Sequence, residues 1–143
     1  MSIHSSLHNQ ANNRITHLEV YKKAITLFKT SRLLATYITD NKDIATMHTS
    51  SHGSDRYSLQ MVMDSMSLAP DIAEIHTTFD MRMKRYRIRR MKRTISRIHK
   101  YCDFIEKHYG HAKDYISLLR QEIAAYRKAH ANWEDNLFKN QMN

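Results

Sequence analysis

The sequence is poor in the residues that break helices and make tight turns. Its 143 residues include two glycines and one proline, whereas proteins contain on average about 7% glycine and about 5% proline. Because turns between β-strands depend on these residue types, their scarcity argues against a β-rich fold. A single all-α domain of a few long helices is the economical interpretation for a chain of this length.

The sequence also has one cysteine and no long apolar run. A lone cysteine, Cys102, cannot form a disulfide within the chain, which fits a reducing compartment. No segment has the length and apolar character of a membrane span, and residues 1–14 lack the apolar centre of a signal peptide. We therefore predict a cytoplasmic protein with no membrane partner.

The common motifs of enzyme active sites are missing as well. The carboxylates are scattered, and no GxSxG, P-loop, HExxH or cysteine–histidine arrangement occurs. The histidines of the polar segments, His4, His8, His48 and His52, lack the cysteines or spaced carboxylates that would complete a tetrahedral metal site. The sequence thus predicts a non-enzyme with no cofactor and no metal.

Acidic residues are absent between Asp80 and Asp103, and this absence is the most informative one. The same interval contains ten lysines and arginines, so the remainder of the chain has 13 basic and 14 acidic residues. The net charge of +9 is therefore concentrated in one segment of an otherwise balanced chain.

This basic segment has the spacing of an amphipathic helix. Its apolar positions alternate in steps of three and four residues, and they are Ile88, Met91, Ile95, Ile98, Cys102 and Ile105. The opposite side, about a third of the circumference, carries Arg82, Arg85, Arg89, Arg93, Arg97 and Lys100. The pattern predicts a helix over residues 81–109 with one face in a core, Cys102 included, and the other face cationic.

We predict that the cationic face binds a polyanion rather than serving only to keep the protein in solution. A solvated helix face normally mixes both signs of charge, because like charges repel. Nucleic acid is the polyanion that a ladder of arginines fits, although phosphate contacts alone do not separate RNA from DNA. The predicted contacts are Arg82, Arg85, Arg89, Arg93, Arg97 and Lys100, with Arg90 and Lys92 at the periphery.

Other residues of the basic helix have different predicted roles. Lys84 and Arg87 fall toward its apolar side, where they either meet a neighbouring subunit or extend their charged ends out of the seam. Tyr86, Tyr101 and Tyr109 lie among the cations and are candidates for stacking on unpaired bases. For Tyr109 the helical phase favours core packing.

The remaining pattern predicts three further helices and a polar tail. The predicted helices span residues 16–39, 55–79, 81–109 and 112–138, and residues 1–15 are predicted to be disordered. Residues 40–54 form the one long polar connection, and the other two connections are short. Short connections make sequential helices antiparallel neighbours, so we predict an up-down-up-down four-helix bundle over residues 16–138.

Two stretches carry a resemblance to a known family. Leu18–Ala24 reads LEVYKKA, and Ser67–Glu74 reads SLAPDIAE with Asp71 where the family has asparagine. They resemble signatures of small bacterial four-helix proteins, which include those encoded in intervening sequences of large-subunit ribosomal RNA genes. The basic third helix, together with the late Trp133, is similar to Avd, the accessory variability determinant of diversity-generating retroelements.

The resemblance to Avd implies a function that composition alone does not. It implies a homopentameric ring that binds a reverse transcriptase and template RNA and supports mutagenic cDNA synthesis, with no catalytic residue of its own. Two alternatives stay open. One is a protein-interaction scaffold whose cations bind an acidic protein, and the other is a ribosomal-RNA-binding protein without a reverse transcriptase partner.

Overall fold

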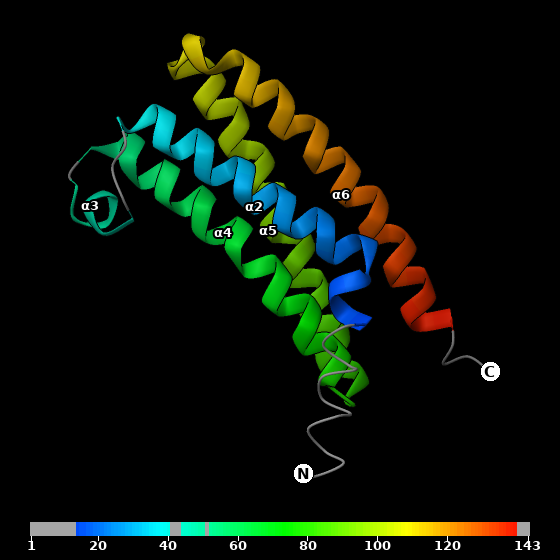
Figure 1. Cartoon of the computed structure of the whole chain (residues 1–143). Helices are drawn as coiled ribbons and strands as arrows, with labels where there is room; N and C mark the ends of the chain where they lie inside the picture. Colours follow the sequence, from blue (N-terminus) through cyan, green and yellow to red (C-terminus); the bar gives the residue numbers. More distant parts are fainter. Residues whose placement is uncertain (1–13, 41–43, 51, 140–143) are drawn as a thin grey trace, which may run out of the picture.

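The computed structural model describes residues 14–40, 44–50 and 52–139, and its regular elements are all helices (Figure 1). Within these ranges no β-strand occurs, so the predicted all-α class is confirmed. The elements are α2 (Glu19–Ile38), α3 (Ile44–Thr49), α4 (Gly53–Thr77), α5 (Met81–His108), the 3-10 helix η1 (Gly110–Ala112) and α6 (Lys113–Lys139).

The long helices lie side by side, and each of them has two long neighbours (Figure 1). Helix α2 packs against α4 and α6, and α5 packs against the same two helices from the other side. Helices α4 and α6 are bridged at one end, where the Trp133 Nε1–H donates a hydrogen bond of 3.0 Å to His76 Nε2. Helix α5 therefore has protein on two flanks and leaves its outer face open.

The apolar face of α5 lies in the core, as the helical spacing predicts. All six seam positions are buried, with Met91, Ile98 and Cys102 fully enclosed. Burying one large aliphatic side chain contributes about 1.5–3 kcal/mol. This row anchors α5 to the remaining helices, and burial also raises the pKa of the Cys102 thiol to about 12, which fits its predicted role as a core residue.

Helical structure begins earlier than predicted. Residues 14–17 form a helical turn, and the chain bends at Leu18 before α2 starts at Glu19. Ile15, which we expected in a disordered tail, is buried in the core because the bend turns its side chain inward. The rest of the predicted tail, residues 1–13, lies outside the described residues.

The predicted long connection contains an unpredicted helix. Helix α2 ends at Ile38 and is followed by Asp40 with a φ of 54°, a left-handed conformation that aspartate tolerates better than most residues. Helix α3 follows, and its Met47 is buried as α3 packs against α4. Met47 thus packs this polar stretch against α4, and the stretch is too short for its apolar spacing to predict a helix.

The connection between α4 and α5 is three residues long and ends where the sequence predicted. The side chain of Asp80 accepts a hydrogen bond of 2.9 Å from the backbone N–H of Arg82 and caps α5. Thr78 closes α4 by donating its hydroxyl proton to the carbonyl of Glu74. Phe79, between these two capping residues, is left almost fully exposed. No helix in the described ranges is long and apolar enough to cross a membrane.

The buried seam predicts a stability difference along α5. Ile98→Ala should lower the free energy of unfolding by about 2–5 kcal/mol, because it leaves a cavity among fully buried neighbours. Ser96→Ala, a change at an exposed position of the same helix, should alter it by less than about 0.5 kcal/mol. Urea unfolding followed by circular dichroism measures both variants. Equal stabilities would mean that this face of α5 is not in the core.

Candidate nucleic-acid interface

Nine of the ten lysines and arginines between Asp80 and Asp103, all except Lys84, divide into three groups according to what they contact. On the flank facing α4 they pair with carboxylates, and on the flank facing α6 they contact a glutamate and an aromatic ring. Between the flanks, a row of cations points to solvent. This division decides which of the predicted residues remain available to a ligand.

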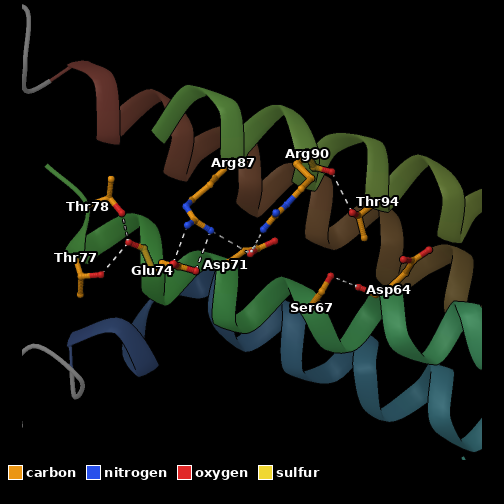
Figure 2. A network of polar contacts seen from close by, with 9 residues as sticks. All are labelled: Asp64, Ser67, Asp71, Glu74, Thr77, Thr78, Arg87, Arg90 and Thr94. Atoms are coloured by element: carbon orange, nitrogen blue, oxygen red, sulfur yellow. Dashed lines mark hydrogen bonds and ion pairs between the residues drawn. The ribbon is translucent and has the colours of Figure 1, made fainter. Parts of the chain in front are cut away.

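On the α4 flank, Arg87 and Arg90 meet two acidic residues (Figure 2). Both outer nitrogens of Arg87 donate to Glu74, at 2.8 and 2.7 Å, which makes a bidentate pair. Arg90 donates to Asp71 at 2.7 Å, and Arg87 lies 3.9 Å from the same carboxylate. Figure 2 shows both arginines reaching from α5 toward Asp71 and Glu74 on α4.

Further along the same flank, Arg97 is bound by Asp64. The Arg97 Nε and one outer nitrogen donate to the two carboxylate oxygens at 3.1 and 3.2 Å, and Tyr101 donates its hydroxyl proton to Asp64 at 3.2 Å. The Asp64 side chain is 9% exposed and that of Arg97 is 46% exposed. Burying a carboxylate without a partner is costly, so Asp64 depends on Arg97 more than the reverse. This hydrogen bond raises the pKa of Arg97.

These three pairs form a regular ladder, which we call the α4–α5 ion-pair ladder. From Glu74 to Asp71 to Asp64 the chain steps back by three and then seven residues, and from Arg87 to Arg90 to Arg97 it steps forward by the same numbers. Residues at such spacings share one helix face. Two complementary rows of charge therefore meet along α4 and α5, and they run in opposite chain directions.

The α6 flank carries Lys92 and Arg85. Lys92 forms an ion pair of 2.9 Å with Glu134, whose carboxylate also lies 3.5 Å from His130 Nε2. Burial lowers the pKa of His130, so its neutral form is favoured beside this pair. The Arg85 guanidinium lies 4.8 Å from the centre of the Phe138 ring. Such stacking occupies the flat face of the guanidinium and leaves its N–H edges available to phosphate.

The third group is the central cation row, made of Arg82, Arg89, Arg93 and Lys100. These side chains are exposed, and they have no carboxylate partner in the described part of the chain. Beside the C-terminal half of the row, a hollow of about 320 Å³ is lined by Lys92, Arg93, Ser96, Arg97 and Lys100. Of these residues, Lys92 and Arg97 are paired with carboxylates, so the donors that the hollow offers to a phosphate group are those of Arg93, Lys100 and the Ser96 hydroxyl.

Some of the predicted phosphate contacts are therefore already paired with carboxylates. Arg97 was expected in the first line of contacts, yet its guanidinium is engaged by a buried aspartate. Arg90 and Lys92, assigned to the periphery, are paired with Asp71 and Glu134. Arg87 pairs with Glu74 of its own chain. The acidic partners lie on α4 and α6, outside the basic segment, so the composition of that segment alone does not indicate them.

The three tyrosines of the basic helix have separate environments. Tyr101 is partly buried and lies edge-on to Tyr57, while Tyr109 packs against the core as its helical phase predicts. Tyr86 alone of the three is exposed. Among the described residues no three histidine, cysteine or acidic side chains come together as a metal site, and His4 and His8 lie outside those residues.

Comparison with known proteins adds no assignment. The sequence matches no protein-family model, and the comparisons with curated proteins and with solved structures give no match either. The function must therefore be inferred from the residues and their arrangement.

The Asp64–Tyr101 contact predicts a pH dependence of stability. Burial, followed by the Asp64 charge, raises the pKa of Tyr101 from 10.0 to about 12. A raised pKa in the folded state contributes stability that is complete below pH 10 and is lost as the pH rises from 10 to about 12. Tyr101→Phe should therefore weaken the alkaline loss of stability more than Tyr115→Phe, a change at an exposed tyrosine. Urea unfolding at several pH values tests this, and equal profiles for both variants would contradict it.

Proposed function

We propose that this protein is a non-catalytic nucleic-acid-binding subunit whose ligand contacts the central cation row. The observation that carries the proposal is that Arg82, Arg89, Arg93 and Lys100 have no acidic partner among the residues that the structure describes, while the cations on both flanks of the same helix have partners of their own. Four like charges on one helix face repel each other. A polyanion removes that repulsion, because it neutralises the whole row at once.

The dimensions of the row fit an extended anionic strand. From Arg82 to Lys100 the helix rises about 27 Å at roughly 1.5 Å per residue. Arg85 and the hollow beside Arg93 add donors to the two sides of this line. Such a row contacts the sugar–phosphate backbone and reads no base sequence, so we propose binding to RNA, and to DNA by the same contacts.

We further propose that the chain is an accessory subunit of a diversity-generating retroelement in the cytoplasm. The support is the resemblance of Leu18–Ala24, of Ser67–Glu74 and of the basic helix to Avd. In this role the protein binds a reverse transcriptase and template RNA and supports mutagenic cDNA synthesis, and it supplies no catalytic residue. Ribosomal RNA is the alternative ligand if no reverse transcriptase is its partner.

The proposed assembly is a ring of five antiparallel up-down-up-down four-helix protomers. Support for the protomer comes from the short connection between α4 and α5 and from the opposite chain directions of the two rows in the ion-pair ladder. The ring rests on the family resemblance. Five central cation rows on one particle would bind one long strand far more tightly than a single row does.

A protein-interaction scaffold is a second candidate, and one observation favours it. The carboxylates of α4 complement the flank of α5 position by position. An acidic helix of another protein can match the central cation row in the same way. The binding experiment below includes an acidic protein as a competing ligand for this reason.

Nucleic-acid binding should depend on the central cation row and on salt. With four phosphates neutralised, a fourfold rise in salt should weaken RNA binding by about 50- to 150-fold. Arg89→Glu combined with Arg93→Glu should weaken binding at least about tenfold and lower the logarithmic salt slope by about two. Fluorescence anisotropy of a labelled RNA at two salt concentrations measures both effects.

A matched control keeps the charge change and moves it elsewhere. Arg32→Glu combined with Arg56→Glu alters exposed arginines on α2 and α4, and it should leave most of the affinity intact. If the two double variants bind RNA equally well, the central cation row is not the binding surface. If the unchanged protein binds an acidic protein but no RNA, the scaffold is the correct function.

The proposed ring predicts the mass of the particle. In native buffer, multi-angle light scattering or native mass spectrometry should give a species of five copies of the chain. A monomer at micromolar concentration would remove the ring from the proposal, whereas RNA binding by the single row would be unaffected.

A further inference from the structure

Three large apolar side chains are exposed at the N-terminal end of the central cation row. They are Phe79, Met83 and Tyr86, which are 99%, 41% and 49% exposed. Phe79 stands in the connection between α4 and α5, and the other two residues occupy the first turns of α5. Large apolar side chains on a surface commonly mark a contact site. Leaving them exposed loses the stabilisation that their burial in the core would give.

The position of Tyr86 relative to the cations is fixed by the helix. It follows Arg82 by four residues and precedes Arg89 by three and Arg93 by seven. All three spacings put side chains on one helix face. The phenol ring of Tyr86 therefore stands in line with cations that have no acidic partner in the described ranges.

The polar contacts of the fold do not involve the Tyr86 side chain, which is 49% exposed. Two other tyrosines, by contrast, are held by polar partners: Tyr101 donates to Asp64, and the Tyr126 hydroxyl contacts His130 Nδ1 at 3.1 Å. Within the described residues the Tyr86 hydroxyl has no hydrogen-bond partner and its ring has no aromatic neighbour. A conformationally stiff aromatic ring is thus available to a ligand at the N-terminal end of the cation row.

Aromatic rings interleaved with cations suit a nucleic-acid strand whose bases are unpaired. Each base has a flat π-face that stacks on an aromatic ring, while the neighbouring phosphates meet arginine or lysine. In a duplex these faces are covered by the adjacent base pairs, so only the phosphates remain accessible to a helix face of this kind. An acidic protein segment supplies charge but offers no comparable flat surface to Tyr86 and Phe79.

We propose that Tyr86, with the exposed Phe79 of the preceding connection as a second and separate ring, is a stacking platform that selects single-stranded nucleic acid over duplex. This proposal rests on the proposed function, since the central cation row supplies the phosphate contacts that bring a strand to the platform. It names the ligand class, an unpaired phosphodiester strand with intact bases. The 2′-hydroxyl plays no part in this selection, so RNA and DNA strands are both ligands.

The test separates base stacking from phosphate binding. Three labelled ligands are titrated onto the full-length protein: a single-stranded dodecamer, an abasic dodecamer with the same phosphates, and a duplex of that length. The unchanged protein should bind the single strand at least about fivefold more tightly than the abasic strand. Tyr86→Ala should remove about five- to 100-fold of single-strand affinity, and it should change abasic and duplex binding by less than about twofold.

Two matched variants accompany Tyr86→Ala in the binding test. Tyr86→Phe keeps the ring and should keep the affinity, whereas Tyr115→Ala removes an exposed tyrosine on α6 and should have no effect on any of the three ligands. Circular dichroism and thermal unfolding confirm that each variant folds like the unchanged chain.

The outcomes distinguish this proposal from the function on which it rests. If Tyr86→Ala weakens all three ligands equally, or if abasic and base-containing strands bind equally well, the stacking platform is refuted. In that case abasic binding that is still lost on Arg89→Glu plus Arg93→Glu leaves the proposed function intact. If no oligonucleotide binds and polyglutamate does, both proposals are overturned.

Discussion

The arrangement of charge in this protein depends on the α4–α5 ion-pair ladder. Asp64 and Asp71 are buried, so their carboxylates require cationic partners, and α5 provides these at matching intervals. The ladder and the buried apolar row of α5 share one rotation and register of α5 against α4. Once that rotation is set, Arg89 and Arg93 cannot reach the same carboxylates and must face solvent. The open cationic face is therefore a consequence of internal pairing as much as of composition.

Much of the fold could be predicted because helical periodicity is a local signal. The buried seam of α5 follows from apolar spacing, and the structure adds Asp80 as the residue that caps the helix before Met81. The sequence was less informative where tertiary contacts decide. Ile15 and Met47 lie in mainly polar stretches, which are too short for apolar spacing to predict their burial.

The pairing of charges at the candidate site also depends on tertiary contacts. The cationic face could be predicted from one helix, but its division into paired and unpaired cations could not, because this requires two helices in register. A signal did exist: the acids of α4 are spaced by seven and three residues, in mirror order to Arg87, Arg90 and Arg97. When α4 and α5 are aligned in opposite chain directions, these matched spacings indicate the partners of Arg90 and Arg97.

The Trp133–His76 hydrogen bond has a practical consequence. Trp133 is the sole tryptophan, and its indole N–H is held by an imidazole from a different helix. Burial lowers the pKa of His76, which keeps that imidazole a neutral acceptor near physiological pH. The tryptophan fluorescence of the protein, excited at wavelengths that tyrosine does not absorb, thus comes from one junction between α4 and α6. The wavelength of its emission maximum therefore reports whether Trp133 stays packed against His76 or has become accessible to water.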